Sequence, residues 1–482
     1  MNPSDRKKLL AWAGIYASLT LGWVVLARGI LEPMLAARPL GPVGLGIQKY
    51  LYVPPVLFLT QDLVGQWREL TSAVVIAIAM HAAVVIRTGR ATSRTLEVVL
   101  GVAAAAFLGV AVLAGYRQDY FFYEEIWYHV LRGEDPWFLV SGMLGRYPLN
   151  AYGPLFNLFA GAAWINPRAP RLLDAFAYLM FASATCRAFA AKRPGRAIAW
   201  LAPLVLLANP YPWIEAAFYG HFDVMVALAT LAAVRARERG REALSGLWLA
   251  TGVLLKYLPI ALLPILADDR DGKPLRFRGR FLITAILVIA GGMAISALVW
   301  GRSTFRPMEL AATRPAMGAS LAWAIRGPNS PLRGTEIAVN IETLSTLAQL
   351  GAIAAAWRWS RARRPAIEAA VLSAAMGLVV FYRVGYPQYQ MSPFLLGWAW
   401  LLDGWDRFRL RVVPALAVGL YTAWIGAVDT LYLLDDVWRL PVGWSRVEET
   451  AGFLILLLGV GVVASVVAAE PARPRLPSSE AV

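Results

Sequence analysis

Long apolar runs separated by short basic loops recur along almost the whole 482-residue chain. A bilayer-spanning helix needs a run of about 17–25 such residues. The alternation of apolar and polar positions that is typical of transmembrane β-barrels is not found in the sequence. The pattern predicts an all-α, polytopic integral membrane protein with about 12 transmembrane crossings plus interfacial and re-entrant helices.

Clusters of lysine and arginine predict the orientation of these helices. They follow the N-terminus and recur near residues 87–94, 235–241 and 358–364, and such clusters mark cytoplasmic loops. The first apolar run continues to about residue 30 with no clear small-residue cleavage site, which indicates a retained anchor rather than a signal peptide. We expect both termini to be cytoplasmic.

One apolar segment, residues 243–267, has basic loops on both sides. Both loops are expected inside, so the segment must enter the membrane and return. Pro259, in the sequence Lys256-Tyr257-Leu258-Pro259, is a suitable break because proline interrupts helical hydrogen bonding. Broken helices in membranes are tolerated where they line a cavity, so Lys256 is a candidate cavity residue.

Composition agrees with this class and excludes others. The mean hydropathy is +0.54 and 58% of the residues are hydrophobic, well above soluble proteins. The net charge of +15 does not indicate a nucleic-acid partner, because the basic residues lie in short loops between apolar runs. The one cysteine, Cys186, can form no internal disulfide, and three histidines beside one cysteine argue against a zinc site.

An acidic and aromatic insert begins where the apolar run 96–115 ends. It opens with Asp119, and residues 120–130 are expected to lie flat at the interface. Ionisable groups at membrane depth usually face a cavity or a partner. Several polar residues at helix ends predicted to be external therefore indicate an active-site cavity open outward: Asp119, Glu124, Glu125, His221, Asp223, Lys256, Arg383 and Gln388.

Ordered motifs around these residues resemble a known superfamily. They are Asp119-Tyr120, Gly133-Glu134-Asp135-Pro136-Trp137, Tyr152-Gly153-Pro154-Leu155, Gly220-His221-Phe222-Asp223, Lys256-Tyr257-Leu258-Pro259 and Gln388-Tyr389. In this order they resemble GT-C glycosyltransferases. They are most similar to the GPI mannosyltransferase I catalytic subunit and to bacterial polyprenol-phosphate mannosyltransferases. The resemblance covers roughly residues 96–402.

The resemblance implies a domain organisation. Residues 1–94 would form N-terminal transmembrane helices outside the matched part. Residues 95–403 would form a GT-C-like catalytic core with external loops 116–150 and 300–342. Residues 404–482 would add C-terminal helices and a disordered, proline-rich cytoplasmic tail.

The resemblance also implies a reaction. The enzyme would move a sugar from a polyprenyl-phosphate donor to a hydroxyl of a lipid-linked or glycan acceptor, with inversion. The resemblance implies mannose, and arabinofuranose, glucose or another pentose are the alternatives. Asp119 would be the general base, because a positioned carboxylate activates a poorly nucleophilic hydroxyl. Fixed cations would receive the leaving phosphate, and the candidates are Lys256, Arg383 and His221. The remaining candidates would bind substrate: Glu124, Glu125, Asp223, Tyr152 and Gln388.

The sequence departs from the superfamily at one point. Many members carry a second acidic residue two positions from the first, whereas in this chain Arg117 and Phe121 occupy the positions two before and two after Asp119. We therefore expect a metal-independent enzyme without a cofactor. The composition, rich in alanine, arginine and glycine, favours a bacterial plasma membrane with the site facing the periplasm or exterior. Besides substrates, membrane lipids are the expected partners.

Each candidate also has a structural interpretation. Asp223 could cap a helix, and Lys256 could reach to the membrane surface. His221 could be an interfacial hydrogen-bonding residue, and Arg383 could mark a helix end. Glu124 and Glu125 could form the solvated face of the interfacial helix. For the whole protein, the alternative is a secondary transporter or flippase for a lipid-linked or small polar substrate, since transporters also contain broken helices and midplane charges.

Overall fold

The computed structural model describes residues 93–113, 119–142, 145–269, 277–408, 412–438 and 443–470. In these ranges the elements are helices, apart from four strands of 2 or 4 residues. The predicted crossings near residues 9–30 and 71–86 and the predicted disordered tail lie outside these ranges and stay predictions.

Six described helices are long and apolar enough to cross a membrane: Arg94–Val112, Ala169–Ala191, Ala197–Tyr219, Gly279–Ala311, Val412–Asp435 and Trp444–Ala469. Shorter apolar helices accompany them at Pro154–Ile165, Glu242–Leu255, Leu258–Ala267 and Ile367–Val380. The expected all-helical, polytopic membrane architecture is thereby confirmed. The number of crossings and their orientation remain predictions.

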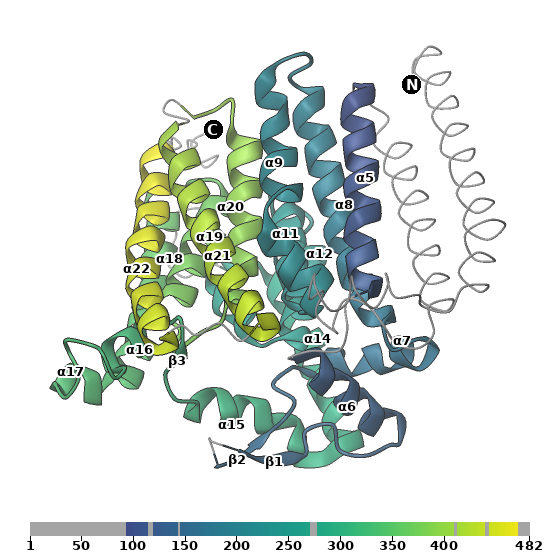
Figure 1. Cartoon of the computed structure of the whole chain (residues 1–482), viewed down its shortest axis with the longest axis vertical. Helices are drawn as coiled ribbons and strands as arrows, with labels where there is room; N and C mark the ends of the chain where they lie inside the picture. Colours follow the sequence, from purple (N-terminus) through teal and green to yellow (C-terminus); the bar gives the residue numbers. More distant parts are fainter. Residues whose placement is uncertain are drawn as a thin grey trace, which may run out of the picture. The chain divides into compact units, whose positions relative to one another are not determined.

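The described residues divide into two compact units. The first contains residues 93–113, 119–134, 158–225 and 426–438. Its elements are α5 (Arg94–Leu113), α6 (Asp119–Leu131), α7 (Phe159–Ile165), α8 (Ala169–Ala191), η3 (Ala197–Trp200), α9 (Leu201–Leu207), α10 (Pro210–Pro212) and the π-helix η4 (Trp213–Tyr219). Figure 1 labels α5 to α9.

The second unit contains the other described residues. Its elements are β1 (Leu139–Gly142), β2 (Gly145–Pro148), η2 (Pro154–Leu158), α12 (Glu242–Leu255), η5 (Leu258–Leu262), α13 (Leu263–Ala267), α14 (Gly279–Trp300), η6 (Gly301–Phe305), α15 (Arg306–Thr313), β3 (Met317–Gly318), α16 (Leu321–Arg326), α17 (Glu336–Val339), α18 (Ile341–Arg363), α19 (Ile367–Val380), β4 (Val384–Gly385), η7 (Pro387–Gln390), α20 (Met391–Gly404) and α22 (Trp444–Ala469). Three helices contribute residues to both units: η2, α11 (Asp223–Glu238) and α21 (Val412–Trp438).

In the first unit, α5 and α8 pack against each other along apolar faces. The ring of Phe107 stacks on that of Tyr178 with centroids 5.4 Å apart. Arg187 of α8 forms a buried ion pair with Glu97 of α5. A charge inside a membrane helix requires such a partner, so this pair holds the two helices in one register.

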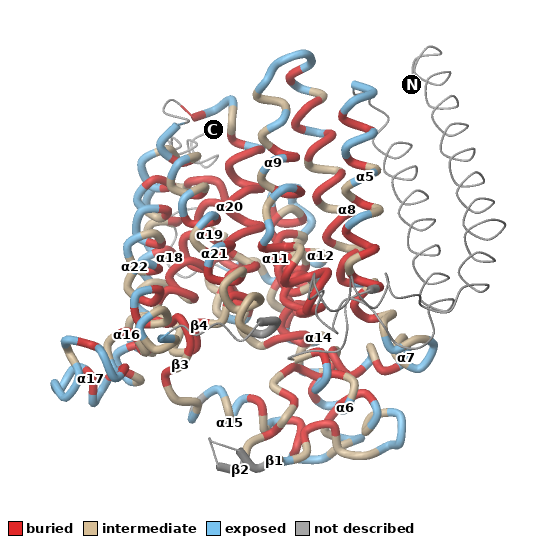
Figure 2. The backbone as a smooth tube through the Cα atoms, in the orientation of Figure 1, coloured by how far each residue is buried: buried red, intermediate tan, exposed pale blue. Residues whose placement is uncertain are grey.

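In the second unit, small residues allow helices to approach closely. A Cβ atom on Gly246 of α12 would lie 2.5 Å from the carbonyl oxygen of Phe281 on α14. Membrane helices commonly associate through such small residues, because apolar side chains gain little by leaving lipid. Helices α19 and α20 are buried along nearly their whole length and form the core of this unit (Figure 2).

The strands are short and local. Strands β1 and β2 form an antiparallel hairpin in which Leu139 pairs with Pro148. Strands β3 and β4 pair in parallel, with Met317 opposite Val384. The second pair joins the turn after α15 to the turn before η7, and both turns adjoin residues of the candidate site.

Candidate functional site

Asp119 is the first residue of α6, where we expected a carboxylate at a helix end. A helix N-terminus stabilises negative charge through its free backbone N–H groups. The side chain is 40% exposed, and its Oδ2 lies 3.5 Å from Nε2 of His221. Two predicted site residues from distant parts of the chain are therefore neighbours, and the carboxylate remains accessible.

His221 is buried between two carboxylates. Its Nδ1 lies 2.5 Å from Oε2 of Glu215, and its backbone N–H donates to the Glu215 carbonyl oxygen at 2.8 Å. Burial disfavours the imidazolium, but Glu215 and Asp119 outweigh it and raise the pKa of His221 to about 10. Both ring nitrogens of His221 thus face carboxyl groups, which favours the imidazolium form.

The local backbone explains how His221 reaches this position. The π-helix η4 ends at Gly220, which has φ +67°. A Cβ atom there would lie 2.9 Å from Arg171 Cγ and 2.9 Å from a ring carbon of Tyr120. Two features require glycine at position 220: the left-handed backbone and the close approach of Arg171 and Tyr120. Single-turn π-helices are rare and often occur at functional sites.

Aromatic packing fixes α6 against this turn. Tyr120 is fully buried, and its hydroxyl donates to the Pro167 carbonyl oxygen at 2.6 Å. The guanidinium carbon of Arg171 lies 4.0 Å from the centre of the Tyr120 ring. Tyr123 and Trp127 meet Phe222 edge to face, with centroids 5.8 and 5.9 Å apart. Asp119 is therefore presented by a helix whose buried face is immobilised.

Three buried acidic residues around His221 were not predicted from the sequence. Glu215 belongs to η4, Asp174 to α8 and Asp429 to α21, and all three side chains are at most 1% exposed. Asp174 lies within electrostatic reach of Asp223, His221 and Glu215. Each missed residue lies in an apolar run, and acidic residues there are a known signal of function, so the pattern could have indicated them.

The other acidic candidates lie on α6 and α11. Glu124 is half-buried and Glu125 is exposed, on a helix whose exposed face also carries Phe121 and Tyr128. Such an aromatic face suits the headgroup region of a membrane. Asp223 is buried at the start of α11, so both the capping and the site interpretations of this residue stay open.

A second group of candidates lies in the second unit around the break in α12. The helix ends at Leu255, and Lys256 has an extended backbone, as the proline pattern predicted. Lys256 is buried, with its Nζ 4.1 Å from the centre of the Tyr389 ring and 5.3 Å from that of Tyr152. Its ammonium group is held between aromatic rings rather than at the surface.

Lys256 lines a cavity of about 280 Å³. Polar groups in its wall come from Arg314, Thr346, Gln349, Tyr382 and Tyr389. The remaining wall is largely apolar, with contributions from α15, α18 and α19. Arg314 was not among the predicted site residues, although its loop is rich in arginine. It donates to the hydroxyl of Tyr389 at 3.4 Å.

Arg383 supports the wall of this cavity. Its guanidinium donates to the Arg314 carbonyl oxygen at 3.2 Å and to the hydroxyl of Thr346 at 2.9 Å. Gln388, in η7, is buried next to Tyr389 in the chain. The structure thus brings Lys256 and Tyr152 together and gives Arg383 contacts with two residues that line the cavity.

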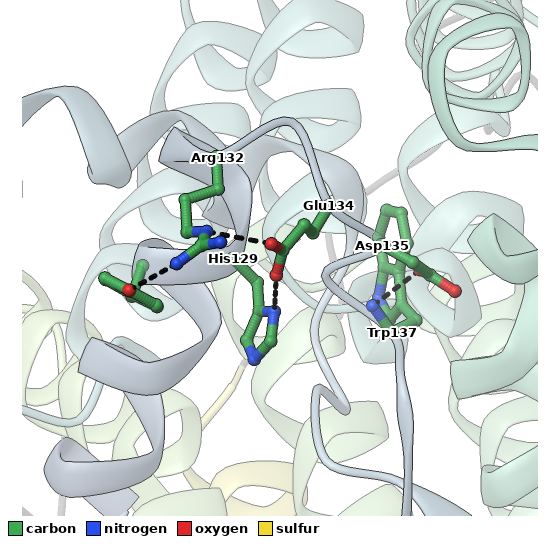
Figure 3. Close-up of polar contacts among 6 residues, drawn as sticks. His129, Arg132, Glu134, Asp135 and Trp137 are labelled. Atoms are coloured by element: carbon green, nitrogen blue, oxygen red, sulfur yellow. Dashed lines mark hydrogen bonds and ion pairs between the residues drawn. The ribbon is translucent and has the colours of Figure 1, made fainter.

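The Asp135-Pro136-Trp137 motif anchors the Tyr152 segment. The Trp137 indole N–H donates to the Tyr152 carbonyl oxygen at 3.1 Å, and Arg306 donates to Asp135 at 2.7 Å. Asp135 also accepts the Trp137 backbone N–H at 2.9 Å, as Figure 3 shows. The motif therefore positions Tyr152 beside Lys256, which is a structural reason for its occurrence.

At the end of α6, Glu134 joins two basic residues. Its carboxylate lies 2.8 Å from Arg132 Nε and 2.5 Å from His129 Nδ1 (Figure 3). The hydrogen bond from His129 is the main cause that lowers the pKa of Glu134. This exposed cluster closes the C-terminal end of the helix that presents Asp119.

Within the described ranges, no group of three or more His, Cys, Asp or Glu side chains is arranged to hold a metal ion. The candidate residues are instead paired with groups of the chain itself, Asp119 with His221 and Lys256 with Tyr389. Metal independence of the enzyme remains an expectation from the sequence.

Comparison with known proteins finds one family model that matches part of the chain. Residues 155–382, just under half of the chain, match the model of Glycosyltransferase family 87. The match includes His221, Asp223 and Lys256, whereas Asp119 precedes it and Arg383 and Gln388 follow it. No curated protein and no solved structure matches the chain. The match supports the predicted class, a membrane glycosyltransferase of the GT-C type, for which polyprenyl-phosphate sugars are typical donors.

Proposed function

We propose that the chain, a glycosyltransferase by its family 87 segment, moves a sugar from a polyprenyl phosphate to an acceptor hydroxyl with Asp119 as the base. The observation that carries this proposal is the accessible Asp119 carboxylate, at the start of α6 and 3.5 Å from buried His221. The carboxylate is therefore open to an acceptor hydroxyl, which a general base must reach within hydrogen-bond distance.

In the proposed step, Asp119 takes the proton of the acceptor hydroxyl. The oxygen attacks the anomeric carbon, and the bond from that carbon to the phosphate oxygen breaks. The electron pair leaves with the polyprenyl phosphate, and the single displacement inverts the anomeric centre. The base is required because a sugar hydroxyl is a weak nucleophile.

The leaving phosphate gains negative charge as this bond breaks. We assign its stabilisation to Lys256 and Arg314, which line the same cavity of about 280 Å³. The apolar part of the wall suits the first isoprene units of the donor. Arg383 and Tyr152 would hold these two cations in place, through the contacts of Arg383 with the Arg314 carbonyl and of Tyr152 with Lys256.

We propose the sugar, the acceptor and the membrane face from the resemblance of the motifs to GT-C glycosyltransferases. Mannose is the proposed sugar, and a lipid-linked or glycan hydroxyl is the proposed acceptor. The enzyme would act at the outer face of a bacterial plasma membrane. Glu124, Glu125, Asp223 and Gln388 are proposed to contact substrate, and His221 to act on the base rather than directly on the donor phosphate.

The test is the Asp119→Asn variant, assayed in detergent with polyprenyl-phosphate mannose as donor and an alkyl mannoside as acceptor. Asparagine keeps the shape of the side chain but cannot take a proton. We expect transfer to fall by about 10²–10⁴, the range of a lost general base. Glu336→Gln, at an exposed acidic residue of α17, is the matched control and should keep wild-type turnover.

If the Asp119→Asn variant turns over at the wild-type rate, Asp119 is not the general base. The transporter alternative predicts a different result. Purified protein in proteoliposomes would then move the donor lipid or a small polar substrate across the bilayer without forming a glycoside.

A further inference from the structure

A buried carboxyl pair lies behind the candidate base. Glu215 faces His221 on one side and contacts the carboxyl group of Asp429 on the other. Glu215 and Asp429 are each 1% exposed. Two carboxyl groups in contact and out of water cannot both be ionised, so they share one proton.

The position of that proton follows from the charges around the pair. Glu215 contacts the imidazolium of His221, which favours a negative charge on Glu215. Asp429 has no such cation: within the described residues, its Oδ2 has no hydrogen-bond partner. We therefore place the shared proton on Asp429, the member of the pair that does not contact His221.

Glu215 holds His221 by two kinds of contact. The backbone oxygen of Glu215 accepts the His221 backbone N–H at 2.8 Å, and the side chain lies 2.5 Å from Nδ1. Both contacts depend on the π-helix, because its wider turn brings the residue after Gly220 over the Glu215 carbonyl. With Nδ1 occupied in this way, Nε2 is directed toward Asp119.

We infer that Glu215 is a positioning residue of the proposed reaction, which holds His221 as an imidazolium against Asp119 while Asp429 carries the proton of the buried carboxyl pair. This inference rests on the proposed function only for the role of Asp119. Other groups act on His221 as well: Asp174 of α8 and Asp223 of α11 lie nearby, and the rings of Tyr123 and Tyr219 enclose it.

The charge of His221 can be measured without any substrate. The chain has three histidines, so ¹⁵N-histidine labelling gives three imidazole signals. The variants His81→Asn and His129→Asn assign two of them by loss and leave His221. We expect wild-type His221 to stay protonated through pH 9, and to titrate near its ordinary value of about 6.5 in Glu215→Gln.

The matched control is Asp429→Asn. If Asp429 already carries the proton, an uncharged amide of the same shape changes little, and His221 should titrate as in the wild type. A His221 that titrates near 6.5 in the wild-type protein overturns the inference without need of any variant. So does a Glu215→Gln protein whose His221 titrates as in the wild type. If Glu215→Gln does not fold, the shorter Glu215→Asp serves, with a smaller shift expected.

Activity supplies the second readout, with the same mannosyl donor and alkyl mannoside. We expect Glu215→Gln to lose at least about tenfold in kcat at pH 8.5, with little change in KM. Activity should recover toward pH 6, where the imidazole regains its proton. A role in folding alone would lower the melting temperature without this recovery. If the Asp119→Asn enzyme is active, the role of Asp119 as base is wrong. The histidine titration then still tests whether Glu215 holds His221 as an imidazolium.

Discussion

At the scale of single residues, environment decides which carboxylates can act. Asp119 is partly exposed and lies 3.5 Å from His221, so a substrate hydroxyl could reach it. Glu215 is buried, so a substrate cannot reach it, and its carboxyl group contacts His221 instead. A carboxyl group therefore serves as the proposed base in one place and as a support for His221 in the other.

A prediction at this scale concerns the cation of the cavity. Lys256→Gln removes the charge beside Tyr389 while keeping most of the length of the side chain. Contacts to a charged group contribute roughly 1.5–3 kcal/mol, so donor affinity should fall by about tenfold or more. The measurement is the KM for polyprenyl-phosphate mannose. Arg333→Gln, at an exposed position outside the cavity, is the control, and an equal KM for both variants would contradict the assignment.

Gly220→Ala tests the turn that carries His221. A Cβ atom would both strain a left-handed backbone and lie 2.9 Å from Arg171 and Tyr120. We expect destabilisation of at least about 2 kcal/mol, seen as a lower melting temperature in detergent. Gly195→Ala is the matched control, because Gly195 has φ +71° and nothing within 4 Å of the added atom. The Gly195→Ala variant should lose only about 1 kcal/mol of stability. If Gly220→Ala and Gly195→Ala lose the same stability, the close contacts at Gly220 do not matter.

At the scale of elements, a broken helix produces the second group of candidate residues, which lies within the second unit. Helix α12 ends at Leu255, and η5 resumes at Leu258 with Pro259 in its first turn. The two-residue gap directs Lys256 inward instead of along the helix surface. Basic loops on both sides and one proline were enough to predict this break. The cavity that surrounds Lys256 was not predictable, because its wall comes from helices far away in the chain.

Packing of α12 on α14 can be tested with two glycines. Gly246→Ala places a Cβ atom 2.5 Å from the Phe281 carbonyl oxygen, which is backbone and cannot move aside. We expect the helices to separate and the melting temperature to fall. Gly291→Ala, on α14 with nothing within 4 Å, should be neutral or stabilising by up to about 1 kcal/mol, since alanine favours helix. The two variants should change the melting temperature in opposite directions. A higher melting temperature for Gly246→Ala would contradict the close contact between α12 and α14.

At the scale of the whole molecule, orientation in the membrane remains a prediction from the basic loops. Native Cys186 is fully buried, so single introduced cysteines can be labelled against a silent background. Glu336→Cys, in the predicted external loop, should react with a membrane-impermeant maleimide in intact cells. Arg239→Cys, in a predicted cytoplasmic loop, should react only after permeabilisation. The reverse labelling pattern would show the opposite membrane orientation, with the proposed site at the cytoplasmic face.

The helical architecture was largely readable from the order of residues. Hydropathy and proline act locally, so a run of apolar residues predicts a helix whatever lies elsewhere. The starts of α6 and α11, at Asp119 and Asp223, were both visible in this way. Candidate chemistry was visible too, because a charged residue in an apolar chain is conspicuous.

Which of these residues meet was a matter of tertiary structure. His221 is close to Asp119 because α6 packs on the turn after the π-helix. Glu215 and Asp429 stand in apolar runs, so the sequence could have indicated each of them, but their contact with one another joins segments far apart in the chain and needed the tertiary structure. Hydropathy reports how well one segment fits into lipid, whereas pairing depends on which helix faces oppose each other. Many arrangements of helix faces satisfy the same hydropathy pattern, so only the packed structure selects one.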